Sequence, residues 1–129
     1  MIRAPDFEGE FHVFTGVRTT PAFSSYRPQH EVHENYQTSG EHTYIGCDCV
    51  QPGETVKVEV RLITPQVYPH CLWEGRELRV LEGAKHVGNL RIKKLFNPLL
   101  NVTPEEYQSV WIEPLGLDLD LPYKGWEND

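Results

Sequence analysis

The chain has 129 residues, of which 39% are hydrophobic and 24% are charged, a composition typical of one soluble globular domain. No apolar run approaches the roughly 18 residues of a membrane span, and the N-terminal residues lack the apolar core of a signal peptide, so we expect a cytoplasmic protein with no membrane association. The net charge of −7 argues against tight nonspecific binding to nucleic acid.

Short strands separated by turn residues dominate the first 96 residues. In chain order, the predicted strands are one around Phe11 and Val13, a weaker one from His30 to Tyr36, one through Ile45, Cys47 and Cys49, one from Thr55 to Pro65, one around Leu78 and Val80, and one from His86 to about Leu95. Short strands at such spacing are typical of an all-β barrel or sandwich.

The clearest predicted strand follows Pro52-Gly53. Apolar residues alternate there with Lys57, Glu59 and Arg61, and this period of two places the apolar side chains inward and the charges outward. The segment from Glu82 to Lys85 has the composition of a hairpin turn. The side chains expected to point into the core are Val56, Val58, Val60, Leu62, Leu78 and Val80.

Residues 97–129 form an acidic extension to the predicted barrel domain of residues 1–96. The extension holds seven acidic residues and one lysine, for a charge of −6, whereas residues 1–96 hold twelve acidic and eleven basic residues, for −1. Thr103-Pro104-Glu105-Glu106 combines an N-cap, a first-turn proline and a capping-box glutamate. We therefore predict a short helix from about Pro104 to Val110.

Four leucines follow this predicted helix and alternate with polar residues up to Leu121. We predict that residues 103–121 fold back onto the barrel, with the leucines on apolar surface and the acidic side chains near Arg76, Arg79 or Lys85. The alternative is a solvated acidic tail, because isolated acidic segments are commonly disordered.

The cysteines form no recognisable catalytic or metal-binding pattern. Cys47 and Cys49 would share one face of a strand, and buried apolar thiols are their expected state. A metal site that adds Cys71 with His70 or His42 is the alternative, although zinc sites usually use Cys-x-x-Cys pairs.

The segment His30-Glu31-Val32-His33-Glu34 differs from a metalloprotease motif, which has two histidines four residues apart on a helix. On a strand, His30 and His33 would point to opposite faces. The chain also lacks a phosphate-binding loop, a nucleophile elbow and a dinucleotide fingerprint. We therefore predict no catalytic residue, metal, cofactor or nucleotide; a small His/Cys metal-binding protein or enzyme is the alternative.

Five segments, in the same order and at nearly the same spacing, resemble the C-terminal (third) domain of elongation factor Tu. They are Phe7 to Phe14, Gly16 to Pro21, Ser25-Tyr26-Arg27-Pro28-Gln29, Gln51 to Pro65, and Leu81 to Gly88. The resemblance extends from about Phe7 to about Leu95. It implies a small closed antiparallel β-barrel of about six strands, which binds partners without catalysis and which stands here without the GTPase domain.

The resemblance also implies a binding site. In the family, the third domain touches the T stem of aminoacyl-tRNA and meets the GTPase domain and elongation factor Ts. The positions of this chain that match the family's tRNA contacts are Arg18, Gln29, Thr38, Glu82 and Gly83, with Lys85 where the family has a basic residue. Thr19 stands where the family has histidine, and Glu31 and Glu34 add carboxylates that would repel phosphate.

We therefore expect a non-catalytic, translation-related binding module whose partner is aminoacyl-tRNA, another RNA stem or a protein of the translation machinery. The alternative is a protein-interaction module that has lost RNA binding, which the net charge of −7 favours. Salt dependence separates the two, because RNA binding weakens with salt according to the number of phosphates contacted.

Overall fold

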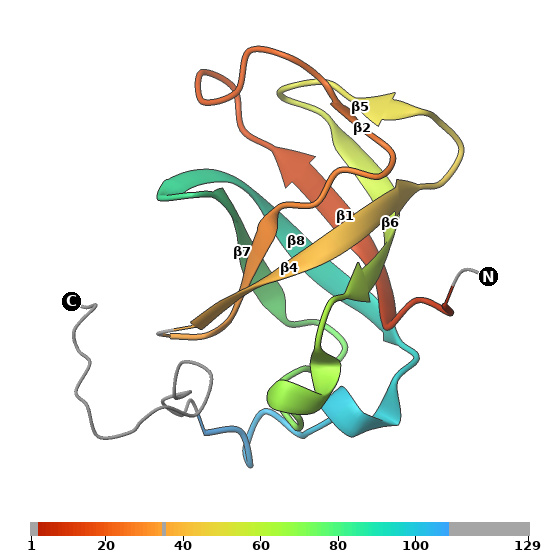
Figure 1. Cartoon of the computed structure of the whole chain (residues 1–129), viewed down its shortest axis with the longest axis vertical. Helices are drawn as coiled ribbons and strands as arrows, with labels where there is room; N and C mark the ends of the chain where they lie inside the picture. The colour runs from red at the N-terminus through yellow and green to blue at the C-terminus, as the bar shows by residue number, and fades with distance from the viewer. Residues whose placement is uncertain (1–2, 35, 109–129) are drawn as a thin grey trace.

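The computed structural model describes residues 3–34 and 36–108. These residues form a closed antiparallel barrel of six strands in the order β1-β6-β4-β3-β7-β8, which confirms the predicted fold class (Figure 1). The barrel strands are β1 (Phe7–Val13), β3 (Gln29–His33), β4 (Tyr36–Tyr44), β6 (Thr55–Leu62), β7 (Glu77–Glu82) and β8 (Lys85–Leu95). The first strand closes the barrel, because β1 pairs with β6 on one side and with β8 on the other.

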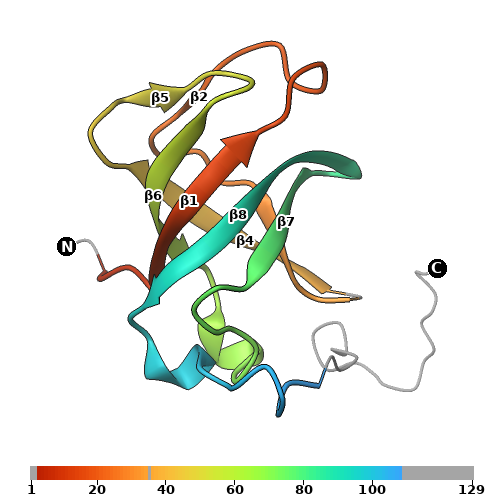
Figure 2. The ribbon, with the colours of Figure 1, turned by 180° about the vertical axis from the view of Figure 1, so that it is seen from behind.

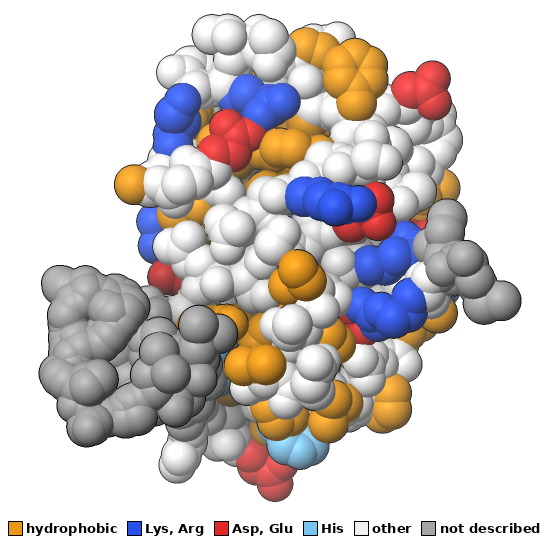
Figure 3. Space-filling view, in the orientation of Figure 1, with side chains coloured by type: hydrophobic (Ala, Val, Ile, Leu, Met, Phe, Trp, Pro, Cys, Tyr) orange, Lys and Arg blue, Asp and Glu red, His pale blue; other side chains and the backbone are white. Residues whose placement is uncertain are grey.

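Smaller elements lie at the two ends of the barrel. At one end, β2 (Ala22–Phe23) pairs with β5 (Cys49–Val50) in a separate two-stranded sheet. At the opposite end lie two single-turn 3-10 helices, η1 (Pro65–Val67) and η2 (Pro98–Leu100), which are also visible from behind (Figure 2). Hydrophobic side chains gather at this end (Figure 3), and the large exposed ones flanking or within the two turns are Ile63, Val67, Phe96 and Leu99.

The core fills the barrel interior. All six side chains that the sequence pattern predicts to point inward from β6 and β7 are buried, with exposures of 8% or less. Phe7 and Phe11 of β1 and Tyr68 are fully buried beside them. Burial of one Val or Leu side chain contributes roughly 1.5–3 kcal/mol, so the alternation of apolar and charged residues fixes which face of each strand points inward.

Strands β1 and β8 approach each other closely at two glycines. A Cβ atom on Gly88 would lie 2.2 Å from the carbonyl oxygen of His12, and one on Gly9 would lie 2.3 Å from that of Arg91. The β1–β8 register shifts at Gly9, where a bulge interrupts the ladder. Because the opposing atoms belong to the backbone and cannot turn aside, both positions require glycine.

Two strand predictions are wrong in their extent. The segment from His30 to Tyr36 is not one strand, because His33 pairs with Tyr36 and the chain reverses between them. The predicted strand that starts at Ile45 is a bend over residues 45–48, in which Gly46 has a φ of 85°. A left-handed residue interrupts an extended backbone, and the chain turns there toward its pairing with β2.

The bend also changes the state of the cysteines. Cys47 is exposed and Cys49 is half-buried, so the expected shared buried face is absent. Cys71 is buried as expected, and its thiol donates a hydrogen bond to the carbonyl oxygen of Tyr68 at 3.0 Å. Burial raises the pKa of the Cys71 thiol to about 12, which makes it a poor nucleophile.

Residues 97–108 pack against the barrel. Leu100 is fully buried, and Asn101 forms a bridge with Leu72. Thr103 accepts a hydrogen bond from the N–H of Glu106 at 3.3 Å, but only a single turn follows, and the predicted helix from Pro104 is wrong as far as Gln108. The chain leaves the helical path at Tyr107, whose ring packs on the barrel. The rest of that predicted helix and the four leucines up to Leu121 lie outside the described residues.

Candidate functional site

The first candidate site is the end of the barrel formed by the β7–β8 hairpin and the loop between β1 and β2. Arg18 of this loop forms an ion pair with Glu82 of the hairpin. The same guanidinium donates to the carbonyl oxygens of Thr20, at 2.9 Å, and Pro21, at 3.2 Å. Its centre lies 4.7 Å from the ring centroid of Tyr26. Arg18 therefore fastens the loop to the hairpin.

Glu82 is the acceptor at the centre of this arrangement. It accepts hydrogen bonds from Arg18 and from the Tyr26 hydroxyl. Burial raises the pKa of Tyr26, and the bond to the Glu82 carboxylate raises it further, so the hydroxyl keeps its proton and remains a donor. Two of the predicted contact residues, Arg18 and Glu82, thus neutralise each other.

Three further predicted contact residues adjoin this ion pair. Gln29 is half-buried and pairs with Leu81 across the β3–β7 seam, next to Glu82. Gly83 lies at the hairpin turn with a φ of 62°, and Lys85 is exposed at the start of β8. The structure therefore brings together five of the six predicted residues.

Thr38, the sixth, lies in the core and is not available for a surface contact. Its exposure is 3%, and its hydroxyl shares a hydrogen bond of 2.8 Å with the Tyr68 hydroxyl. The period of two in β4 turns this side chain inward, because Thr38 alternates with the exposed Gln37 and half-buried Ser39.

Two buried histidines, one from β3 and one from β4, lie next to each other in the core. His30 and His42 are both fully buried, and their Nε2 atoms lie 2.9 Å apart. His30 Nδ1 must carry a hydrogen, because it faces the carbonyl oxygen of Thr38 at 3.3 Å. His30 Nε2 then accepts from His42 Nε2–H, and His42 Nδ1 accepts from the Tyr44 hydroxyl at 3.1 Å.

This chain of hydrogen bonds stabilises two neutral imidazoles. Burial lowers the pKa of His30 to about 4. Burial lowers the pKa of His42 as well, and the neighbouring His30 adds to the effect. With no exposed ring and every ring nitrogen paired, the two histidines have a structural role.

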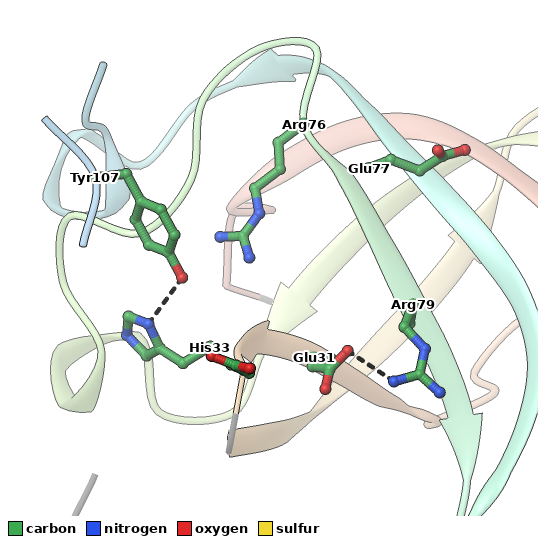
Figure 4. Close-up of a pocket in the computed structure, with 7 residues that line it drawn as sticks. Glu31, His33, Arg76, Glu77, Arg79 and Tyr107 are labelled. Carbon is green, nitrogen blue, oxygen red and sulfur yellow. Dashed lines mark hydrogen bonds and ion pairs between the residues drawn. The ribbon is translucent and has the colours of Figure 1, made fainter. Parts of the chain in front are cut away.

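The second candidate site is the seam between β3 and β7. These strands pair at only two positions, Gln29 with Leu81 and His30 with Val80, and then separate. An open concavity of about 280 Å³ occupies the gap (Figure 4). Its lining residues are Glu31, His33, Glu34, Arg76, Glu77, Arg79 and Tyr107.

Two side-chain bridges cross this seam. Arg79 of β7 forms an ion pair with Glu31 of β3 at 3.1 Å. The Tyr107 hydroxyl donates to the carbonyl oxygen of Val32 at 3.1 Å, where the ladder between the strands has ended. A bulge interrupts β3 between Glu31 and His33. His33 lines the concavity, whereas His30 lies in the core against His42.

His33 and Tyr107 pack against each other in this gap. Their rings stack with centroids 5.8 Å apart, and His33 Nδ1 lies 3.0 Å from the Tyr107 oxygen. Since the Tyr107 hydrogen is directed to Val32, His33 Nδ1–H is the donor of this bond. Burial lowers the pKa of His33, and the charge of Arg76 lowers it further, so the ring is neutral at pH 7.

Among the described residues that line the concavity, Arg76 is the cation without an ion pair. Its guanidinium lies 4.8 Å from the Tyr107 ring and 5.1 Å from the Trp73 ring, and it donates to the carbonyl oxygen of Cys71. None of the ion pairs within residues 3–34 and 36–108 includes Arg76. Sequence reasoning missed this site, because no local pattern links Tyr107 to residues about 31 and 75 positions earlier.

Replacing Tyr107 with phenylalanine should lower the free energy of unfolding by about 1 kcal/mol, because the change leaves the Val32 carbonyl and His33 Nδ1–H without their partner. Urea denaturation measures the effect. Tyr36→Phe is the control, since Tyr36 is also half-buried and packs on an aromatic ring, that of Tyr68, but its hydroxyl forms no hydrogen bond to another residue of the described ranges 3–34 and 36–108. Equal stability of the two variants would contradict a bridging role for Tyr107.

No group of three or more His, Cys, Asp and Glu side chains within residues 3–34 and 36–108 is arranged to hold a metal ion. In the described part of the chain, no helix is long and apolar enough to cross a membrane. No protein-family model matches the chain.

Proposed function

We propose that the chain is a non-catalytic binding module, related to translation and similar in role to the third domain of elongation factor Tu. Its contact face is the hairpin end of the barrel, where Gln29, Gly83 and Lys85 adjoin the Arg18–Glu82 ion pair. The observation that carries the proposal is a pair of contacts at this end: Arg18 and Tyr26 both bind Glu82, and these bonds connect the hairpin to the β1–β2 loop. A surface held in this way is suited to recognition, because little ordering is left to occur on binding.

The charges on the surface favour a protein partner. Arg18, Arg27 and Arg61 each form an ion pair with a glutamate, and Lys and Arg side chains on the face of Figure 3 lie beside acidic ones. Affinity for RNA depends on cations that are free to neutralise phosphates. The exposed apolar side chains flanking η1 and η2, such as Ile63 and Phe96, are also more typical of protein contacts.

An RNA stem is the second candidate partner. The observation that favours it is the exposed Lys85 next to the open Gly83 turn, where a Cβ atom would meet nothing within 4 Å. A phosphate group could approach the backbone closely at such a position. This candidate also rests on the resemblance of the matching residues to tRNA contacts.

Lys85→Glu should abolish capture of the partner by the full-length chain, because it reverses the exposed charge of the hairpin face. The control is Lys93→Glu, an exposed lysine of the same strand farther from the hairpin, which should retain capture. Affinity capture from extracts, with quantitative mass spectrometry, compares the two variants with the unmodified chain. Loss of binding in both or in neither would reject the hairpin face as the contact surface.

Total tRNA distinguishes the two partner classes. If the partner is a protein, we expect no tRNA binding tighter than about 10⁻⁴ M at physiological salt, the weak end of nonspecific binding. Micromolar binding, with a log–log salt slope of about −0.9 for each phosphate contacted, would instead establish the RNA candidate.

A further inference from the structure

The guanidinium of Arg76 is positioned to bind an acidic group, and no acidic side chain within residues 3–34 and 36–108 forms an ion pair with it. Its two aromatic neighbours and the bond to the Cys71 carbonyl hold the guanidinium in one position. The face of the group is covered by rings, while its remaining N–H donors are directed along its edge. A guanidinium edge matches a carboxylate, with which it can form two parallel hydrogen bonds.

Three glutamates line the concavity, namely Glu31, Glu34 and Glu77, and none of them forms an ion pair with Arg76. Glu31 is paired with Arg79 at 3.1 Å. Glu77 lies opposite Arg91 in the β7–β8 ladder, and its side chain points away from Arg76 (Figure 4). The ion pair of Glu31 reduces the repulsion that an entering carboxylate would meet.

The described part of the chain ends next to this site. Tyr107 contacts Arg76 and His33, so the described chain ends one residue beyond the concavity. Glu113, the first acidic residue after Glu106, follows six residues after Tyr107. Six residues span at most roughly 20 Å, which exceeds the 4.8 Å between Arg76 and the Tyr107 ring several-fold.

We propose that the concavity between β3 and β7 is a carboxylate-binding site occupied by the acidic segment of the same chain, with Glu113 paired to Arg76. The closure of a short loop makes Glu113 a better partner than Asp118 or Asp120, because the entropy cost of loop closure rises with loop length. Attachment to the same chain also gives the carboxylate a high effective concentration at the site. An acidic segment of another protein must then displace the chain's own segment, so the site is self-inhibited.

The test follows the titration of individual carboxyl groups in the full-length chain by carbon-13 NMR. We expect Glu113 to titrate at least about 0.5 pH unit below Glu127, because a nearby guanidinium favours the ionised carboxyl. In Arg76→Gln this difference should disappear, whereas Arg91→Gln, an exposed arginine in β8, should leave it unchanged. Arg76→Lys keeps the charge and should retain part of the difference.

A second measurement covers the case in which Arg76→Gln perturbs the barrel. The Nε–H signal of Arg76 in the unmodified background should shift in Glu113→Gln and stay in place in Glu127→Gln. If Glu113 and Glu127 titrate together and Glu113→Gln leaves Arg76 unchanged, the proposal is overturned. It is equally overturned if Asp118 or Asp120 responds in place of Glu113, or if only an added free acidic peptide shifts the Arg76 signal.

Discussion

Acidification from about pH 7 to about pH 5 is expected to lower the free energy of unfolding by about 2 kcal/mol through His30 alone, with a further loss through His42. In the unfolded chain both rings take up protons near the usual value of 6.5, whereas folded His30 does so only near 4. The unfolded state therefore binds more protons throughout this window, and stability falls as the pH falls.

The geometry gives the reason for the lowered affinity for protons. A proton added to His30 Nε2 would face the N–H of His42 across 2.9 Å, and one added to His42 Nδ1 would displace the hydrogen donated by Tyr44. The phenyl ring of Phe11 packs edge-on against His42, and the side chain of His42 is fully buried, so a charge on it would lie in an apolar environment. Neither ring can become charged without losing a hydrogen bond.

Urea denaturation at a series of pH values measures this loss. The double variant His30→Leu with His42→Leu should lose most of the pH dependence, and the remainder includes the part from His33, whose pKa is also lowered by burial. His70→Gln, which changes an exposed histidine, should retain the full dependence. Asp6 does not contribute between pH 7 and pH 5. Burial raises its pKa, but hydrogen bonds from Arg3, Asn97 and Leu62 outweigh this, so the net pKa lies below the usual value of an aspartate. An unchanged slope in the double variant would assign the effect to other groups.

Gly88→Ala should destabilise the barrel by about 3 kcal/mol or more, the upper end of the cost of overpacking. The new methyl group would lie 2.2 Å from the His12 carbonyl oxygen and 3.0 Å from the Phe11 ring. Relief requires β1 and β8 to move apart, which breaks ladder hydrogen bonds on the seam that closes the barrel.

Arg91→Ala is the matched control for this prediction. It changes an exposed position of the same strand, opposite Glu10, and should alter stability by no more than about 0.5 kcal/mol. Circular dichroism and thermal melting compare the two proteins. If Gly88→Ala melts together with Arg91→Ala, the close approach of the two strands does not hold in solution.

The parts of the fold that follow from local patterns could be predicted from the sequence. The alternation from Val56 to Leu62 specifies one inward face, and Glu82 to Lys85 connects two strands that pair in the structure. The resemblance of five segments then selects a closed barrel over a sandwich. It also identifies residues that meet at one end, because Arg18 and Glu82 are 64 positions apart in the chain and still form an ion pair.

The other features depend on contacts that no local pattern encodes. The left-handed Gly46 ends the extended chain after Tyr44, although Ile45, Cys47 and Cys49 keep a strand-like alternation. Thr38 is polar, yet it points inward because Tyr68 offers it a hydrogen bond inside the core. The seam site needs the bulge near His33 and the placement of Tyr107, both of which are decided only when distant segments pack.

The strand order has a consequence for biosynthesis. β1 leaves the ribosome before the other strands of this barrel, but its neighbours are β6 and β8, and the second of these ends only at Leu95. At a synthesis rate of roughly 5–20 residues per second, the nascent chain carries Phe7, Phe11 and Val13 on an open edge for about 4–16 s before closure can occur. An open apolar edge is a template for pairing with other chains. We expect the growing polypeptide to depend on a chaperone during this interval, and the finished barrel, which has no such edge, to be released from it.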